Sequence, residues 1–447
     1  MGQLRIIAIF AVMNDEELYS RFLECSGVTT DSRSCEQGTM FFALKGGRFN
    51  GNDFVLQALE KGCPYAVTDE PERKGFNDSR ILAVPDVLKA LQAMALRHRR
   101  KLGLPVLGIT GTNGKTTTKE LVTAVLSKSF NVLSTKGNLN NSIGVPLTVL
   151  QMKPEHQIAV IEMGASHPGD IDELVNVCDP DFGLITNVGM AHLLGFGSFE
   201  GVKKTKGELY DWILNKKGKV FVNRDNAHLT DMAKGLECIT YGQKSEGYVT
   251  GGVIGCDPTL ELWWNMENGP RHTVRMNLAG SYNIDNALAA ATVGCYFNVP
   301  EENITEALEE YVPRNNRSQI TDTGRNRLIV DAYNANPTSM KAALDNMGFM
   351  KAGQKMLILG DMLELGEAGP TEHRRIVGLI RSSGYKDVFL VGKEFRNAAG
   401  GILPEGWRCF SNVDELCDWL ESGKPEGKTI LIKGSNSIGL TKVVGFL

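Results

Sequence analysis

Apolar residues in the middle of this chain gather in short continuous runs that alternate with helical patterns. The runs are PVLGIT (105–110), NVLST (131–135), IAVIEMG (158–164), FGLITNV (182–188) and KVFVN (219–223). Because polarity does not alternate within them, we expect strands that are covered on both faces, as in a parallel sheet with helices on either side. The strand–helix rhythm therefore predicts a doubly wound α/β domain.

The pattern changes twice further along the chain. TGGVIG (250–255), LELWW (260–264) and HTVRMNL (272–278) predict an antiparallel meander, and helical patterns follow over 283–297 and from 298 onward. Beyond Pro313 four more buried-strand runs, at 327–337, 355–362, 387–392 and 429–437, predict a second α/β domain.

The first hundred residues form a separate pattern of short apolar runs and Gly/Asn turns. A helix predicted over 85–102 is followed by the helix-breaking GLP at 103–105. We therefore expect three domains, at residues 1–103, 104–312 and 313–447. Residues 1–20 are interpreted as the first structural element and not a signal peptide, because acidic residues follow the apolar stretch and a small-residue cleavage pattern is missing.

Composition narrows the function class. The 447 residues exceed what one hydrophobic core supports. A net charge of −4 gives no basic field for nucleic acid, and no apolar run reaches membrane-spanning length. Nine scattered cysteines without a C-x-x-C pair predict reduced thiols in a cytoplasmic protein without structural zinc. We also expect a monomer, because no long amphipathic repeat occurs.

GITGTNGKTTT (108–118) joins a buried strand to a helix through a glycine turn. Backbone N–H groups at such a turn, together with the helix N-terminus, favour a phosphate. Lys115 is placed to reach terminal phosphates and Thr116 to offer a hydroxyl to Mg²⁺. The strict phosphate-loop pattern fails at Ile109, which stands where its first glycine belongs. The nucleotide-binding residues predicted here are Gly111, Thr112, Asn113, Gly114, Lys115, Thr116 and Thr117.

The same loop resembles the ATP loop of the Mur ligases, the amide-bond-forming enzymes of peptidoglycan precursor synthesis. Three further stretches, at 30–54, 134–150 and 330–340, are most similar to members that add D-alanyl-D-alanine to UDP-N-acetylmuramoyl-tripeptide. The resemblance spans nearly the whole chain. It implies an N-terminal UDP-substrate-binding α/β domain, a central P-loop ATPase-like domain with a mostly parallel sheet, and a C-terminal Rossmann-like α/β domain.

The resemblance also implies an ATP-dependent, ADP-forming ligation through an acyl phosphate, with two Mg²⁺ ions. It assigns catalytic roles to Lys115, His192 and Lys206. Glu162, which ends a buried strand, and His192 would bind magnesium, with Thr116 and a carbamylated Lys206 supporting the ions. Glu162 could instead be a surface residue at a strand end, and Lys203 and Lys204 compete with Lys206 for the carbamylated position.

The remaining site residues follow from matched motifs. Asn283 and Asn286 would contact adenine, although Asn283 could instead cap a helix. Arg317, Asp331 and Asn334 would reach the phosphates or ribose of ATP. The substrate-binding residues would be Ser32, Arg33, Lys45, Arg48, Asn138, Asn140 and Asn141, although turn formation could explain one of the three asparagines.

The sequence leaves alternatives open. Another Mur-type ligase or a folylpolyglutamate-synthetase-like ligase would share the mechanism, whereas a nucleotide-switch ATPase or a non-catalytic UDP-sugar-binding module would not. Asn436 stands where the family usually carries an arginine, which leaves the recognition of D-alanyl-D-alanine open. The third residue of the tripeptide, lysine or diaminopimelate, is not readable.

Overall fold

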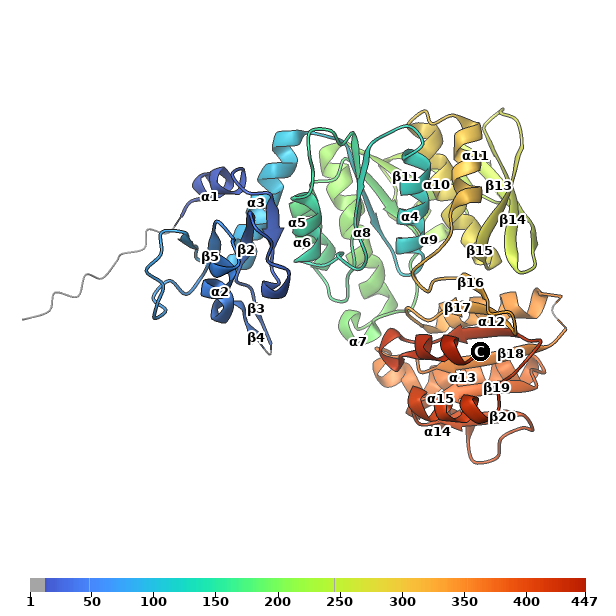
Figure 1. Ribbon diagram of the computed structural model, residues 1–447. Coiled ribbons are helices and arrows are strands. Elements are labelled where there is room, and N and C mark those ends of the chain that lie inside the picture. The colour runs from blue at the N-terminus through green and yellow to red at the C-terminus, as the bar shows by residue number, and fades with distance from the viewer. Residues whose placement is uncertain (1–12, 48, 245, 352) are drawn as a thin grey trace, which may run out of the picture. The chain divides into compact units, whose positions relative to one another are not determined.

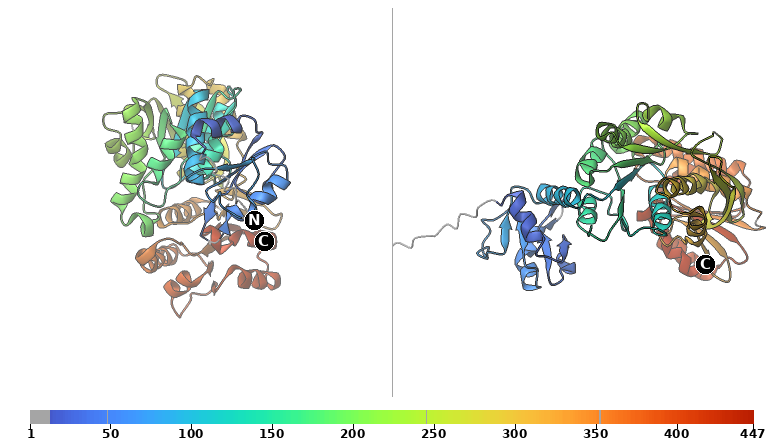
Figure 2. Two further views of the ribbon diagram at one scale, coloured as in Figure 1. Left: turned by 90° about the vertical axis from the view of Figure 1, so that its left-hand side faces the viewer. Right: turned by 90° about the horizontal axis from the view of Figure 1, so that it is seen from above.

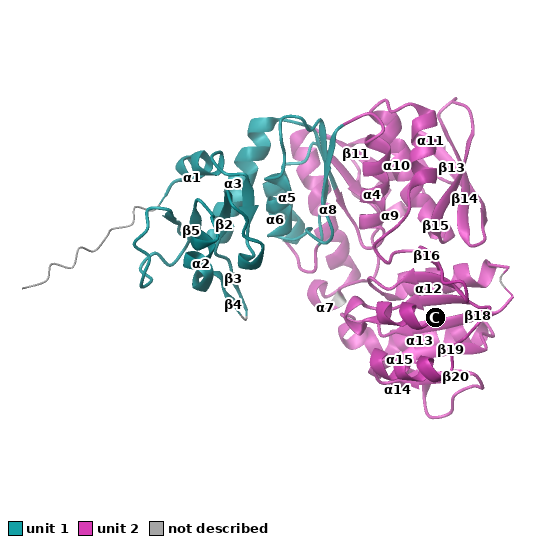
Figure 3. Ribbon diagram, viewed as in Figure 1, with its two compact units in different colours: residues 1–108, 131–164, 170–181 teal, residues 109–130, 165–169, 182–447 magenta. Residues whose placement is uncertain are grey.

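The computed structural model describes residues 13–47, 49–244, 246–351 and 353–447. The predicted first element at 1–20 lies partly outside the described residues. The predicted substrate contact Arg48 lies wholly outside them. The chain divides into two compact units, one of Met1–Gly108, Asn131–Gly164 and Asp170–Asp181, the other of Ile109–Phe130, Ala165–Gly169 and Phe182–Leu447 (Figure 3). The three predicted domains, with their boundaries after residues 103 and 312, stay a prediction.

The first unit contains a four-stranded parallel sheet in the order β1-β2-β5-β6 and a parallel pair, β8 and β9. Phe41, Val55 and Ala66 are among the buried residues of its core. Its elements are α1 (Asp15–Phe22), β1 (Gly27–Thr29), β2 (Thr39–Phe42), β3 (Lys45–Gly46), β4 (Phe49–Asn50), α2 (Val55–Glu60), β5 (Ala66–Thr68), β6 (Ile81–Ala83), α3 (Val87–Leu102), β8 (Val132–Ser134), α5 (Gly144–Val149), β9 (Ile158–Glu162) and α6 (Asp170–Cys178).

Helix α3 shows why the predicted break at 103–105 exists. The Asp86 side chain caps its N-terminus by accepting from the Lys89 N–H, and Gly103 ends it in the left-handed conformation. Its buried face, which includes Leu91 and Met94, packs on α5 and α6. The predicted helix is confirmed.

The second unit follows β7 (Val106–Thr110), within which the division between the units falls. Its strands continue from one to the next in the order β10-β11-β12-β13-β14-β15-β16-β17-β21-β18-β19-β20. Its first elements are α4 (Lys115–Leu126), β10 (Phe182–Ile185), α7 (Leu193–Phe196), α8 (Phe199–Lys216), β11 (Lys219–Asn223), α9 (Ala227–Met232), β12 (Glu237–Gly242), β13 (Val249–Cys256), β14 (Thr259–Met266), β15 (His272–Ala279), α10 (Ile284–Tyr296) and α11 (Glu301–Glu310). The predicted meander is β13–β15, which pairs antiparallel.

Helix α10 is buried almost all round, because it packs against α4 and against strands β11–β14 (Figure 1). This contact brings the start of α10 to the start of α4, which is the helix of the phosphate loop.

The C-terminal half of the unit confirms the second predicted α/β pattern. Its elements are β16 (Gln319–Asp322), β17 (Arg327–Asp331), α12 (Pro337–Phe349), β18 (Lys355–Gly360), α13 (Gly369–Ser382), β19 (Asp387–Val391), α14 (Lys393–Ala399), β20 (Trp407–Phe410), α15 (Val413–Ser422) and β21 (Thr429–Lys433). Along β17, Leu328 and Val330 join one buried cluster with α15, while Ile329 joins another with α12 and α13. Helices therefore cover both faces of these strands (Figure 2).

Two findings bear on the predicted environment. All nine cysteines are free thiols. Within the described ranges, no helix is both long and apolar enough to cross a membrane.

Candidate active site

The phosphate loop runs from Gly111 to Gly114, between β7 and α4, and both glycines are required by its geometry. They have positive φ angles, +142° and +79°. A Cβ on Gly111 would lie 2.0 Å from Thr186 Oγ1, and one on Gly114 would lie 2.5 Å from Asn286 Oδ1. A side chain at either position would therefore force its neighbour to shift, so the close approach of the loop to Thr186 and Asn286 requires glycine.

Hydrogen bonds with two residues that follow β10 fix the backbone of the loop. The Asn113 N–H donates to Asn187 Oδ1 at 3.0 Å, and Thr186 Oγ1 donates to the Asn113 carbonyl at 2.6 Å. The Lys115 ammonium donates to the Gly111 carbonyl at 2.7 Å. Sequence reasoning missed Thr186 and Asn187, although their place at the end of a buried strand could have pointed to them.

Asn283 and Asn286 form a buried chain of amides beside the loop. Asn286 accepts from Thr118 Oγ1 and donates to Asn283 Oδ1, each at 2.9 Å, and Asn283 donates to the Ala279 carbonyl at 2.7 Å. The side chain of Asn283 makes no capping hydrogen bond to α10, so the capping alternative is wrong. Adenine contact by either amide stays a prediction.

His192 lies just before α7 and is held by a residue that the sequence reading missed. Its Nδ1 is 2.7 Å from Oε2 of Glu364, which follows β18. Burial lowers the pKa of His192. Glu364 opposes that change, and the ammonium groups of Lys115 and Lys206 add to it. No periodic signal marks Glu364 in the sequence, because it lies in a loop.

Lys206 is the buried member of the three lysines that compete for one role. Its side chain is about as buried as any large side chain in the protein, with Nζ 3.5 Å from the Ala165 carbonyl and 5.5 Å from the centre of the Phe196 ring. Lys203 pairs with Asp231 at 3.3 Å, and Lys204 is exposed. Of the three, Lys206 is therefore the only one that is buried.

Glu162 ends β9 in the first unit and is 1% exposed, so it is not a surface carboxylate. Its Oε1 accepts from Asn140 Nδ2 at 2.8 Å, and its backbone N–H donates to Thr135 Oγ1 at 2.9 Å. In the part of the chain that the structure describes, no group of three or more His, Cys, Asp and Glu side chains could hold a metal ion.

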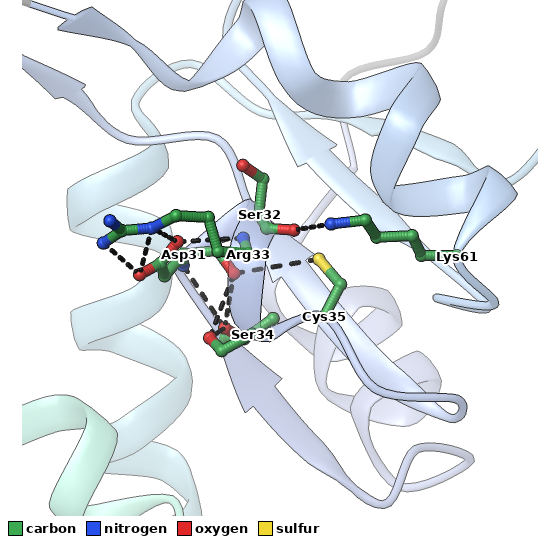
Figure 4. A network of polar contacts seen from close by, with 7 residues as sticks. Asp31, Ser32, Arg33, Ser34, Cys35 and Lys61 are labelled. Carbon is green, nitrogen blue, oxygen red and sulfur yellow. Dashed lines mark hydrogen bonds and ion pairs between the residues drawn. The ribbon is translucent and has the colours of Figure 1, made fainter.

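Two of the predicted substrate cations, Arg33 and Lys45, are paired with carboxylates. Figure 4 shows the Arg33 guanidinium folded onto Asp31, 2.7 Å from Oδ2, and the Lys61 ammonium on the Ser32 carbonyl, at 2.6 Å. The hydrogen bonds from Arg33 lower the pKa of Asp31 to about 2. Lys45 pairs with Asp69 at 2.9 Å and with Glu70 at 3.1 Å. An anionic substrate would have to share these cations.

The three asparagines at 138–141 differ in their surroundings. Asn138 is exposed, and Asn140 holds Glu162. Asn141 accepts from the backbone N–H groups of Ile143 and Gly144, at 3.2 and 2.8 Å, at the start of α5. The turn-forming alternative therefore applies to Asn141.

The C-terminal site residues lie around the end of β17. The Arg317 guanidinium lies 3.7 Å from the centre of the Tyr333 ring. Asp331 Oδ2 is 2.5 Å from Nζ of the buried Lys433, its neighbour in register on β21. The Asn334 amide oxygen accepts from the Ala335 N–H at 2.8 Å.

Two further residues at this end were missed. Lys433 had a usable signal in the sequence, because it is a cation at the end of one apolar run and Asp331 is an anion at the end of another. Asn336 had none. It donates to the loop residue Asn113 at 2.7 Å, and that contact joins segments far apart in the sequence. Asn436 is exposed in a short 3-10 turn.

Known protein families match this chain along most of its length. The model of the Mur ligase family catalytic domain matches residues 24–99, the Mur ligase middle domain matches 109–294, and the Mur ligase glutamate ligase domain matches 316–436. The UDP-N-acetylmuramoyl-tripeptide--D-alanyl-D-alanine ligase of Bacillus subtilis is 36% identical, covering 94% of this chain and 92% of its own. That of Escherichia coli is 33% identical, covering 96% and 95%.

Solved structures are similar over the same length. A crystal structure of MurF from Acinetobacter baumannii has a TM-score of 0.86 at 29% identity and covers 98% of both chains. MurF from Thermotoga maritima, in complex with ADP, has a TM-score of 0.82 at 26% identity, covering 95% of this chain and 97% of its own. The motifs, the three-part family match and the full-length likeness place this chain in the Mur ligase family.

Proposed function

We propose that the protein joins D-alanyl-D-alanine to UDP-N-acetylmuramoyl-tripeptide, with ATP converted to ADP and phosphate. The phosphate loop carries this proposal, because its close approach to Thr186 and Asn286 requires its two glycines and Lys115 stands at the start of α4. The ligases of Bacillus subtilis and Escherichia coli that are named for these substrates are similar over more than nine-tenths of the chain, which supports the choice of substrates.

The proposed reaction has two steps. An oxygen of the tripeptide's terminal carboxylate attacks the γ-phosphorus of ATP, the bond from that phosphorus to the β–γ bridging oxygen breaks, and ADP leaves. The amine of D-alanyl-D-alanine then attacks the acyl carbon, the carbon–oxygen bond to phosphate breaks, and the amine gives its proton to solvent. Such chemistry needs positioning and charge stabilisation rather than covalent help from the protein.

The second unit would hold the nucleotide. Residues 111–117 surround the phosphates with backbone N–H groups and the Lys115 ammonium, and α4 points its N-terminus at them. Arg317 adds a second cation, while Asp331 and Asn334 reach the ribose or phosphates. Asn283 and Asn286, beside Gly114, are proposed to contact adenine.

The residues proposed for magnesium are of suitable types one by one. Glu162 offers a buried carboxylate, and magnesium prefers oxygen ligands of this kind. Glu364 occupies Nδ1 of His192, which leaves Nε2 as the ligand atom. Thr116 offers a hydroxyl, and the buried Lys206 suits carbamylation, which would turn a cation into an anion. Bound magnesium would neutralise phosphate charge.

The first unit would hold the UDP-linked substrate. Ser32, Arg33, Lys45 and Arg48 are proposed for the diphosphate and uracil, and Asn138, Asn140 and Asn141 for the muramoyl or peptide part.

We further propose a cytoplasmic monomer, since the reaction consumes ATP and the nine cysteines are free thiols.

The decisive experiment measures phosphate release from ATP with and without each of the other two substrates. A ligase releases phosphate only when UDP-N-acetylmuramoyl-tripeptide and D-alanyl-D-alanine are both present. Phosphate release in the absence of both substrates would indicate a nucleotide switch. Release that stays at background level under every condition would indicate a non-catalytic module. Lys115→Ala is the control, which should lose turnover and keep its affinity for the UDP substrate.

A further inference from the structure

We infer that Glu120 is a positioning residue, which ties the chain segment that carries Arg317 to the helix that begins at the phosphate loop. Glu120 lies on α4, as does Lys115. The segment 311–318 joins α11 to β16. This inference rests on the proposed function, because it takes Arg317 as a contact of the nucleotide phosphates.

One carboxylate holds two residues of the segment. Asn315 Nδ2 donates to both Oε1 and Oε2 of Glu120, each at 3.0 Å, and the Tyr311 hydroxyl donates a short hydrogen bond to Oε2. Lys119 Nζ is 3.5 Å from Oε1. Hydrogen bonds to a carboxylate are stronger than those between neutral groups, and here they converge on a side chain that is only 28% exposed.

The backbone on either side of Arg317 is bent in a way that needs support. Asn316 and Ser318 have φ angles of +56° and +50°, in the left-handed region that residues with a Cβ rarely adopt. Such a conformation persists where surrounding contacts fix it. Downstream, the Ala332 N–H donates to the Asn316 carbonyl at 3.0 Å, and the Tyr282 and Ser318 hydroxyls lie 2.9 Å apart. On the N-terminal side of Arg317, Glu120 fixes the segment through its hydrogen bonds.

Arg317 itself is held without being neutralised. Its guanidinium stacks on Tyr333, and its buried Nε makes no hydrogen bond to any residue that the structure describes. Burial and Glu120 raise the pKa of Tyr311, and Arg317 opposes that rise, so the cation lies within electrostatic reach of the segment's anchor. A guanidinium keeps its positive charge and presents several donors in a planar fork, which suits the oxygens of a phosphate.

These contacts connect the two ends of the predicted phosphate site. α4 begins at the loop that would hold the phosphates, and Glu120 on the same helix fixes the segment that presents Arg317. Loss of the Glu120 carboxylate should therefore weaken ATP binding through Arg317. A merely structural Glu120 would instead affect stability, and its effect would be independent of Arg317.

The test is a double-mutant cycle on the full chain, with KM values for ATP and for D-alanyl-D-alanine and with ADP affinity by calorimetry. Glu120→Ala should raise KM for ATP and weaken ADP binding roughly tenfold, and leave KM for the dipeptide unchanged. Arg317→Ala should do at least as much. The double variant should match Arg317→Ala alone. Glu310→Ala is the matched control, because it removes another bond to the same region, 2.8 Å to Lys128, without touching the segment.

Each outcome decides the matter. Fold-changes that multiply in the double variant, or a Glu120→Ala protein with unchanged ADP affinity, would overturn the inference. An Arg317→Ala protein with normal ATP affinity would remove both the Arg317 assignment and this inference, while ligation by the wild-type protein would still support the reaction. If Glu120→Ala unfolds at the assay temperature, Glu120→Gln and Tyr311→Phe, which keep the packing, carry the same comparisons.

Discussion

The imidazole of His192 and the carboxylate of Glu364 lie 2.7 Å apart, and both residues have left-handed backbones, with φ angles of +51° and +66°. Each such conformation costs about 1–2 kcal/mol in a residue with a Cβ. Two of them meeting at one contact indicate that the fold places these side chains specifically. A carboxylate on Nδ1 fixes the ring and its tautomer, so the other ring nitrogen is held in one orientation, as the proposed magnesium ligand would need.

Replacing Glu364 should therefore weaken the response to magnesium. Glu364→Gln keeps the size of the side chain and removes its charge, and we expect the Mg²⁺ concentration for half-maximal ligation to rise about tenfold or more. Calorimetric titration of Mg²⁺ with ADP gives a readout apart from turnover. Glu367→Gln, an exposed residue of the same loop, is the control and should behave as wild type. Equal effects of the two changes would contradict the assigned role.

Gly114 should tolerate alanine far less than a glycine with the same φ angle. Gly114 and Gly324 share a φ of +79°, but a Cβ on Gly324 would meet nothing within 4 Å. We expect Gly324→Ala to lose about 1–2 kcal/mol of unfolding free energy. Gly114→Ala should lose about 1–3 kcal/mol more through overpacking against Asn286, and its ADP affinity should fall as well. Chemical denaturation and calorimetry of both variants check this, and matching losses would disprove the steric argument.

Lys206→Ala should be nearly inactive and should regain part of its activity in buffer that contains formate or acetate. A small carboxylate can occupy the space of the missing side chain and supply the anionic oxygens of a carbamate. Lys203→Ala removes only a surface ion pair with Asp231 and should keep its activity without added acid. Steady-state rates across a formate series test this. Full activity of Lys206→Ala without formate would rule out the assignment.

The first unit should lose stability as the solution becomes acidic, because of His98. Its Nε2 donates to the Met152 carbonyl at 2.9 Å, and its Nδ1 lies 3.0 Å from the Tyr19 hydroxyl. Burial lowers the pKa of His98 below the ordinary 6.5, the bond to Met152 opposes this, and Lys101 adds to it. The folded state thus prefers neutral imidazole. Its stabilising contribution is complete above pH 6.5 and is lost as the pH falls from there toward the lower, folded-state pKa.

Urea denaturation between about pH 8 and about pH 5 measures this loss. His98→Gln keeps a donor and an acceptor but cannot take up a proton, so its unfolding free energy should fall less steeply over the same range. Parallel curves for the two proteins would show that other groups cause the acid sensitivity.

The sequence predicted the strands that matter most for the site, because they are buried on both faces. Thr110, Glu162 and Asp331 each end an apolar run, and each was placed correctly at the end of a strand. Strands β12, β16 and β20 were missed because they are partly exposed or short. In β16 no residue is fully buried, so its pattern does not differ from that of a loop.

The contacts between distant segments were not predictable in the same way. Lys115 follows from a local motif, whereas the hydrogen bond from Asn336 to Asn113 and the pair of His192 with Glu364 exist only once the chain has folded. The residues in these contacts lie in loops, where the sequence shows neither the two-residue repeat of a strand nor the 3.6-residue repeat of a helix. The Asn283 cap failed for a different reason. Its side chain donates to the Ala279 carbonyl and accepts from Asn286, and these local hydrogen bonds take the place of a capping bond.

Gly114 and Asn286 face each other with room for no further atom between them. A side chain at Gly114 would force Asn286 to shift, so a change at Gly114 is coupled to the residue at 286. An inhibitor seated against this wall of the nucleotide loop would therefore meet a target with few routes to resistance.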